Sequence, residues 1–395
     1  FFLGRFFYEI VNSARFDVKR NEIKKGAPPT AIGLAPHNTS SPLVKYYTAK
    51  SLDCQQSDEC ELFAKFAPKR ADCVKLSDSY ARLGELRKAY CTADCGTFLQ
   101  YAHGVDDSGA VDPHGRLHSA NFCRDRLCPM CAWRRTLKIY SQVSQIMFAM
   151  GSSFDYLFLT LTVPNCAPCA LSDTISHLFR GFDRLFKRTR VKSAVQGYFR
   201  ALEVTRNAEN NTYHPHLHII LAVNPDYFSN GYIPHPEWLQ MWRDAYGDQS
   251  ITQVDIRRAR AKAPGSDGLA SAVAEIAKYA VKSGDYLTSD LSLTDSIIST
   301  LSRALRGRRL VHFGGIMRQV AKALKLDDPE DGDLINIGEE LHPYVAQLII
   351  TYHWSAGCYG VLSREVVSLD AAELIPDAPE GSVMYLNFDY KDGKK

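Results

Sequence analysis

The sequence contains no stretch of about 18 or more consecutive apolar residues, which argues against a membrane-spanning helix. Its first seven residues are mostly apolar, but Arg5 and Glu9 interrupt this character and no clear cleavage site follows. No internal repeat is evident, so a repeat architecture is not expected. These absences together predict a cytoplasmic protein without a membrane partner.

The number of cysteines is odd, so they cannot all pair in disulfide bonds within the chain. The chain has 11 cysteines, and five of them lie between Cys91 and Cys131. In a chain without a recognisable secretory signal, such clustering favours reduced thiols and metal binding over disulfide bonds.

A strong net charge is missing as well, because the formal charge is only +3. That value is too small to indicate nucleic-acid binding by itself, but the basic residues are unevenly distributed. They form four clusters: Arg124, Arg126, Arg134 and Arg135; Arg184, Lys187, Arg188, Arg190 and Lys192; Arg257, Arg258, Arg260 and Lys262; and Arg303, Arg306, Arg308 and Arg309. Acidic residues gather over 327–333. The candidate DNA contacts are Arg134, Arg135, Arg257 and Arg258.

Patterns of alternation and helical periodicity predict an α+β domain. Strands are expected at 154–163, 198–205, 213–221 and 251–257, and helices at 133–150, 171–190, 236–246 and 269–282. One clear hairpin, formed by the second and third of these strands, indicates a central antiparallel sheet flanked by helices.

The most informative segment is Tyr213–Leu221, which contains three histidines at alternate positions, His214, His216 and His218. Successive side chains of a strand point to opposite faces, so the three imidazoles share one face and Leu217, Ile219 and Leu221 bury the other. If the hairpin is symmetric about Glu209 and Asn210, Glu203 lies opposite His216.

Two imidazoles and a carboxylate suit a divalent ion such as Mg²⁺ or Mn²⁺, although Zn²⁺ is not excluded by these ligands. The expected ligands are His216, His218 and Glu203, with His214 as an alternative to Glu203. An exposed polar face of an edge strand is the simpler interpretation of the same pattern.

The helix expected over 269–282 places polar residues along one stripe. Glu275, Tyr279 and Lys282 are spaced by four and three residues, and Tyr286 follows four residues later. Beside a metal site, Tyr279 is a candidate nucleophile, Glu275 a candidate base and Lys282 a candidate partner for a phosphate. A stripe of this kind is otherwise a solvated helix face.

The cysteine-rich segment predicts a structural zinc site. Cys128 and Cys131 have the spacing of a zinc knuckle, Cys123 adds a third thiol, and either Cys95 or Cys91 completes a tetrahedron. We expect the set Cys95, Cys123, Cys128 and Cys131. Free buried cysteines are the alternative.

These motifs together resemble the rolling-circle plasmid replication initiators, the Rep proteins of the HUH endonuclease superfamily. The matching segments are Asn121–Arg135, Phe158–Asn165, Tyr198–Thr205, His214–His218 and Lys278–Lys282. The resemblance implies that His216 and His218 are the paired metal-binding histidines and that Tyr279 is the nicking nucleophile. It also implies that Glu275 replaces the second tyrosine of two-tyrosine relatives; no Tyr-x₃-Tyr occurs here, and Tyr286 is a weaker substitute.

Four regions are expected on this basis. They are a peripheral arm and linker at 1–50, a helical and cysteine-rich zinc-binding region at 51–150, an HUH nuclease core at 151–290 and a C-terminal accessory region at 291–395. The resemblance implies that single-stranded or hairpin origin DNA is the substrate. A host helicase and polymerase are the further partners expected.

The implied reaction begins with attack of Tyr279 on a phosphate of the origin, leaving a 5′-phosphotyrosine and a 3′-hydroxyl that primes synthesis. Glu275 would later activate water to end the round. Three alternatives remain: a transposase or mobilisation relaxase of the same superfamily, a zinc-stabilised DNA-binding regulator without catalysis, and a metallohydrolase in which water attacks.

Overall fold

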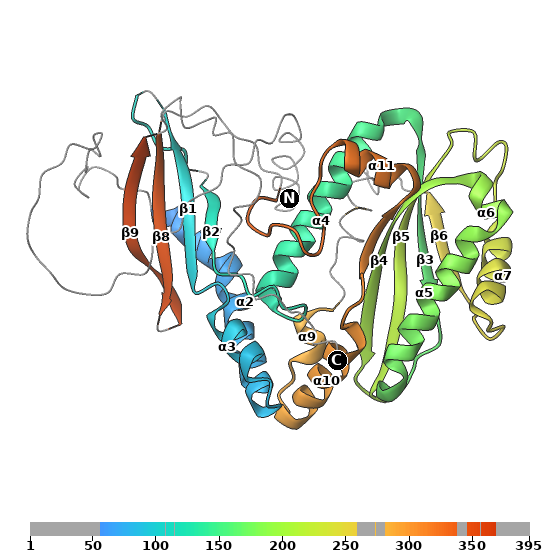
Figure 1. Cartoon of the computed structure of the whole chain (residues 1–395), viewed down its shortest axis with the longest axis horizontal. Coiled ribbons are helices and arrows are strands. Elements are labelled where there is room, and N and C mark those ends of the chain that lie inside the picture. The colour runs from blue at the N-terminus through green and yellow to red at the C-terminus, as the bar shows by residue number, and fades with distance from the viewer. Residues whose placement is uncertain are drawn as a thin grey trace, which may run out of the picture.

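The computed structural model describes residues 56–106, 108–113, 115–258, 273, 281–337, 346–355 and 357–368. Two antiparallel sheets lie on opposite sides of the molecule, with helices between and beside them (Figure 1). The predicted α+β class is therefore confirmed, whereas the arm expected over 1–50 lies outside the described residues. Across the described ranges, no helix has both the length and the apolar character required to span a bilayer.

The five-stranded sheet contains the predicted hairpin at its centre. Its strands, in the order β6-β3-β5-β4-β7, are β3 (Asp155–Thr162), β4 (Val195–Asn207), β5 (Thr212–Val223), β6 (Val254–Arg258) and β7 (Val311–Gly314). All neighbours are antiparallel. Glu203 pairs with His216 and Ala201 with His218, so the register predicted from the hairpin symmetry is confirmed.

Helices cover one face of this sheet. They are α5 (Leu171–Lys187), α6 (Thr189–Ala194) and α7 (His235–Tyr246), and Figure 1 shows α5 running across the sheet. Leu217, Ile219 and Leu221 of β5 have no exposed surface on the face opposite the histidines. The single helix predicted over 171–190 is wrong in one respect, because Arg188 has extended backbone angles and separates α5 from α6.

The four-stranded sheet combines segments that are far apart in the sequence. Its order is β2-β1-β8-β9, with β1 (Phe98–Val105), β2 (Arg116–Ala120), β8 (Ala346–Ser355) and β9 (Cys358–Ser368). The last hundred residues thus contribute to both sheets, since β7 is an edge strand of the other one. The expected region boundaries remain a prediction.

The remaining helices lie mostly between the sheets. They are α2 (Gln56–Arg82), α3 (Leu86–Asp94), α4 (Pro129–Met150), α9 (Ser283–Tyr286), α10 (Leu291–Leu305) and α11 (Gly315–Ala323), with short 3₁₀ turns at Gly151–Ser153 and Pro168–Ala170. Helix α4 begins at Pro129, where the missing N–H of proline is not needed by the helix. The carboxylate of Asp290 caps α10 by accepting from the backbone N–H groups of Ser292 and Leu293.

The acidic run at 327–333 is packed against α4. Lys138, 1% exposed, donates to the carboxylate of Asp327 over 2.7 Å, and Gln142 donates to the same carboxylate over 3.0 Å. The carboxylate of Glu330 accepts from the backbone N–H of Val311 in β7. This acidic segment therefore joins α4 to the five-stranded sheet.

Candidate functional site

Three side chains converge on the face of the β4–β5 hairpin opposite Leu217, Ile219 and Leu221. The Nε2 atoms of His216 and His218 are 3.1 Å apart, and each approaches Oε2 of Glu203, at 3.4 Å and 2.8 Å respectively. Because residues paired across antiparallel strands share a face, the register of β4 and β5 dictates this convergence.

Neighbouring groups hold both imidazoles so that Nε2 faces the centre. The Nδ1 atom of His218 lies 3.3 Å from the hydroxyl of Thr160 in β3, and Nδ1 of His216 lies 3.1 Å from the carbonyl of His214. When a metal is bound, donation of Nδ1–H to these oxygens would leave the lone pair of Nε2 for the ion, and this is the tautomer that ligates a metal. Thr160 was not singled out from the sequence, because its role depends on the pairing of β3 with β5.

The carboxylate of Glu203 is in its charged form. Burial alone raises the pKa of Glu203, but hydrogen bonds with His216 and His218 more than offset burial and hold that pKa well below its ordinary value. The arrangement of two imidazole nitrogens and one carboxylate oxygen fits a divalent ion. His214 is outside this converging set of ligand atoms, so Glu203 is the third candidate ligand.

Of the three residues expected to be catalytic, the structure describes Lys282; its extended backbone angles place it before α9, so the predicted helix does not continue to residue 282. Its Nζ lies 3.4 Å from Oε1 of Glu203, and its side chain is 57% exposed. The lysine therefore reaches the same centre from outside the sheet. Tyr279 and Glu275 lie outside the described residues, so their expected roles stay predictions.

Tyr286, the alternative second tyrosine, has a different environment. It is 1% exposed, and its hydroxyl donates to the carbonyl of Leu127, next to Cys128. Burial also raises the pKa of Tyr286 well above its ordinary value. A phenol of this kind is a poor nucleophile, and it anchors α9 to the loop that precedes α4.

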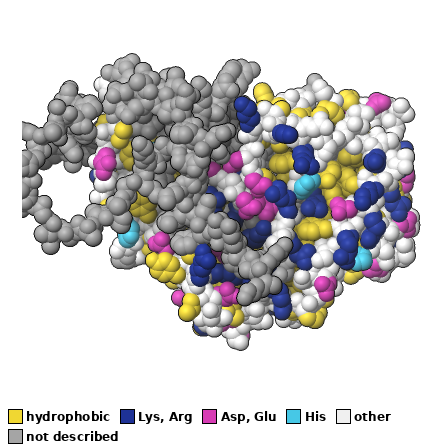
Figure 2. Space-filling view, in the orientation of Figure 1, with side chains coloured by type: hydrophobic (Ala, Val, Ile, Leu, Met, Phe, Trp, Pro, Cys, Tyr) yellow, Lys and Arg dark blue, Asp and Glu magenta, His cyan; other side chains and the backbone are white. Residues whose placement is uncertain are grey.

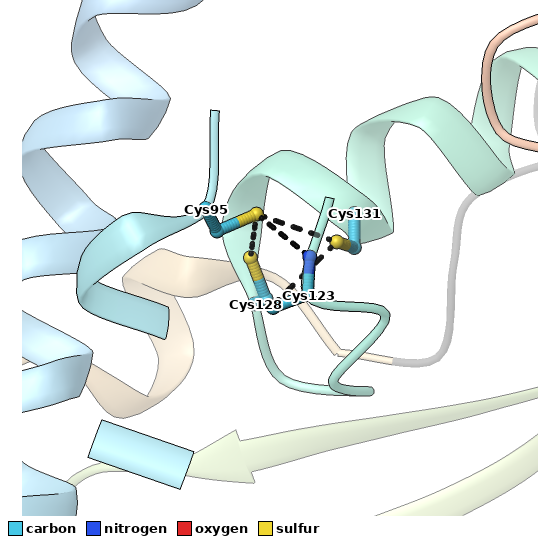
Figure 3. A group of neighbouring side chains, drawn as sticks. All are labelled: Cys95, Cys123, Cys128 and Cys131. Atoms are coloured by element: carbon cyan, nitrogen blue, oxygen red, sulfur yellow. Dashed lines mark hydrogen bonds between the residues drawn. The ribbon is translucent and has the colours of Figure 1, made fainter. Parts of the chain in front are cut away.

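The four cysteines expected to bind zinc lie together (Figure 3). Sulfur–sulfur distances are 3.6 Å for Cys95–Cys131, 3.5 Å for Cys95–Cys128 and 3.8 Å for Cys123–Cys131. Four sulfurs at about 2.3 Å from a tetrahedral zinc would be about 3.8 Å apart, so the thiols are at ligand spacing. Within the described residues the cluster includes Cys95 and not Cys91.

The cysteine cluster is closed to solvent on most sides. Cys95, Cys128 and Cys131 have no exposed surface, and Cys123 is partly buried. Burial raises the pKa of the Cys131 thiol, but hydrogen bonds with the other three cysteines, aided by the charge of Arg135, bring that pKa well below its ordinary value. The backbone N–H of Arg124 also donates to this sulfur over 3.2 Å. Burial raises the pKa of Cys95 and Cys128, so Cys131 is the thiol of this set that most favours the thiolate form. An enclosed set of four thiols leaves no position for substrate, as in structural zinc sites.

Cys73 was missed by the sequence analysis. It lies in α2 with no exposed surface, and its Sγ is 3.5 Å from that of Cys128. Hydrogen bonds with Cys128 and Cys95 lower the pKa of Cys73 to about 5. No spacing signal links Cys73 to the others, because it is 55 residues from Cys128.

The arginines proposed as DNA contacts occupy two different environments. Arg134 and Arg135 are 4% and 3% exposed, and their guanidinium groups donate to backbone carbonyls of Leu334 and Glu330. Their burial does not fit the expected contact with DNA. Arg135 binds the acidic run at Glu330, and Arg134 binds Leu334 directly after that run. The motif residues were interpreted as surface cations, whereas α4 is enclosed on this side.

Arg257 fits the expectation better. It is exposed, and its register through Phe158 puts it on the same sheet face as His218. Its guanidinium lies 4.8 Å from the centre of the Phe158 ring. Arg258 points to the opposite face, where it pairs with Asp155 over 2.6 Å.

Lys and Arg side chains are also numerous over the part of the surface that carries α5, α6 and α7 (Figure 2). Several are engaged: Arg188 pairs with Asp244, and Arg190 with Glu237. This surface is on the helix-covered side of the sheet (Figure 1), opposite the face that carries the histidines.

Comparisons with known proteins find related chains. A family model described as "Replication protein" matches residues 114–359. A "Protein rep" from a Bacillus species is 37% identical over 270 residues, covering 65% of this chain and 86% of the relative. Similar proteins with the same description come from Bacillus amyloliquefaciens (38% identity, covering 64% of this chain and 78% of the relative) and Streptococcus pneumoniae serotype 2 (35%, 68% and 82%).

No solved structure matches the chain. The family match contains Glu203, both central histidines and Tyr279, whereas Cys73 and Cys95 precede it.

Proposed function

The chain belongs to the replication-protein family of plasmid rolling-circle initiators, and we propose that it nicks single-stranded DNA at a plasmid origin through a 5′-phosphotyrosine intermediate. The observation that carries the proposal is the convergence of Glu203, His216 and His218 on one face of a hairpin, with Lys282 beside them. The fold would be of the HUH endonuclease type.

Glu203, His216 and His218 would hold Mg²⁺ or Mn²⁺, which when bound would draw charge from the scissile phosphate. The oxygen of Tyr279 would attack phosphorus, and the bond to the 3′ oxygen would break. The products are a protein–DNA phosphodiester and a free 3′-hydroxyl. Lys282, exposed and next to Glu203, would neutralise charge on a phosphate oxygen.

Termination would use the second polar residue of the stripe. Glu275 would remove a proton from water, and that water would cut the regenerated origin after one round. Tyr286 is buried and bonded to Leu127, which supports a glutamate rather than a second tyrosine in this step.

DNA would lie along the histidine face of the five-stranded sheet, with Arg257 contacting phosphate. The cysteine cluster would bind a structural zinc. The proposal sets this reaction in the cytoplasm, with a host helicase and polymerase acting on the nicked origin.

The test is incubation of the protein with a single-stranded origin oligonucleotide and Mn²⁺, followed by gel separation and peptide mapping of the DNA-linked residue. We expect a covalent adduct at Tyr279 that is absent from Tyr279→Phe and present in Tyr286→Phe. Cleavage without any adduct would replace the proposal with a metallohydrolase in which water attacks. An intact oligonucleotide bound by the protein would favour a regulator without catalysis.

A further inference from the structure

A fifth thiol lies against the cysteine cluster. The Sγ of Cys73 is 3.5 Å from Cys128, the same distance that separates Cys128 from Cys95 and less than the 3.8 Å between Cys123 and Cys131. Cys73 lies in α2, whereas Cys128 directly precedes α4, so the contact joins α2 to the start of α4. By distance alone, Cys73 is as well placed beside Cys128 as the expected ligands are beside one another.

Further contacts of Cys73 support a ligand environment. Its thiol interacts with Cys95 as well as Cys128, and the backbone N–H of Met130 donates to its sulfur. A sulfur that accepts a backbone N–H at the start of a helix has its negative charge stabilised. Two sulfurs of the cluster and one backbone donor thus surround Cys73, which has no exposed surface.

Cys123 is the least enclosed of the five thiols. It is partly exposed and lies in the irregular segment between β2 and α4, before Arg124, whose φ of 63° is in the left-handed region. Its sulfur lies 3.8 Å from that of Cys131. Cys73 contacts Cys128 and Cys95 but is outside the group of four thiols whose sulfurs all lie within 4.8 Å of one another, so a set of Cys73, Cys95, Cys128 and Cys131 would require the sulfurs to shift.

We propose that Cys73 is a reserve zinc ligand, which replaces Cys123 when Cys123 is removed or chemically modified. The inference rests on the proposed zinc site. A tetrahedral ion accepts four thiolates, so a small shift of the ion toward α2 exchanges one ligand while three are kept. In the exchanged state the metal ties α2 to α4, and Cys123 becomes a free, partly exposed thiol.

The test compares five proteins by zinc content and by X-ray absorption at the zinc edge, which counts sulfur neighbours. Cys123→Ser is expected to retain zinc with four sulfurs at about 2.3 Å. Cys73→Ser keeps four sulfurs through Cys123. The double variant Cys73→Ser/Cys123→Ser has at most three. Cys91→Ser, a nearby cysteine outside the cluster, is the matched control and should behave as the unaltered protein.

The outcomes separate the two proposals. If the unaltered protein binds zinc but Cys123→Ser has only three sulfur neighbours or no zinc, the role of Cys73 is overturned and the proposed zinc site stands. Absence of zinc from the unaltered, freshly purified protein would overturn both.

A second measurement covers the case in which Cys123→Ser does not fold. Limited treatment of the zinc-loaded protein with iodoacetamide should alkylate Cys123 first among the five; its sulfur bonds to carbon and iodide leaves. Native mass spectrometry of chains alkylated at Cys123, as identified by peptide mapping, should still show zinc. Loss of zinc in step with alkylation at Cys123 would contradict the proposal.

Discussion

The cysteine cluster and the histidine centre differ in how much of the surrounding chain encloses them. Three of the four cysteines have no exposed surface, and they come from segments that precede or begin α4. In the histidine centre Glu203 and His216 are also buried, but His218 is partly exposed and Lys282, which pairs with Glu203, is more than half exposed. A closed thiol site suits a structural ion, whereas a site with an accessible side suits a substrate.

Removal of the Cys128 thiol should have the largest effect of the substitutions considered for the two sites. Cys128→Ser is expected to lower the melting temperature by about 10 °C or more, because binding of a structural zinc contributes on the order of 10 kcal/mol to folding. Differential scanning calorimetry and zinc analysis measure the effect. A melting temperature within about 2 °C of the unaltered protein would show that the cluster does not support the fold.

His216→Ala should have the opposite profile. Loss of a direct metal ligand is expected to reduce nicking at least about 100-fold, since loss of even outer-shell partners costs 10–100-fold. Its melting temperature should fall much less than that of Cys128→Ser. Initial cleavage rates of a labelled origin strand test the expected loss of nicking. Calorimetry on the same samples tests the expected small change in melting temperature. Retained nicking would exclude His216 as a ligand.

Thr160→Val tests the orientation of His218. We expect Mn²⁺ affinity to fall about 10–100-fold, because the valine cannot accept from Nδ1 of His218. Thr162→Val is the matched control, since the hydroxyl of Thr162 donates to the carbonyl of Gln253 instead. Isothermal titration calorimetry with Mn²⁺ gives both affinities, and equal values for the two variants would rule out this role.

Arg257→Ala should produce the smallest change. Removal of one phosphate contact is expected to weaken single-stranded DNA binding several-fold and to reduce the salt slope by about 1. Arg258→Ala is the control, because Arg258 pairs with Asp155 on the opposite face. Fluorescence anisotropy at several salt concentrations measures both. An unchanged slope for Arg257→Ala would mean that DNA follows another path.

Local patterns predicted much of the histidine centre. Alternation placed His216 and His218 on one face, and hairpin symmetry placed Glu203 opposite His216, because strand pairing across a short loop is determined by neighbouring residues. The close spacing of Cys123, Cys128 and Cys131 was informative for the same reason. These features depend on few intervening residues.

Contacts between distant segments could not be predicted in this way. Arg134 and Arg135 looked like surface cations because the segment that buries them lies about 200 residues later. Thr160 and Cys73 were overlooked because their partners come from other strands and helices. The same limitation hid the contribution of the last hundred residues to both sheets.

The short helix α9 links the histidine centre to the cysteine cluster. Lys282, which precedes this helix, touches Glu203, and Tyr286 at its end is fastened to the carbonyl before Cys128. The two sites are thus connected through the four residues of α9. Chelation strong enough to remove zinc from the cysteines would also disturb Lys282. A loss of nicking after such treatment would therefore not by itself identify the catalytic ion. Exchange of the catalytic ion for Mn²⁺ at constant zinc content is the cleaner experiment.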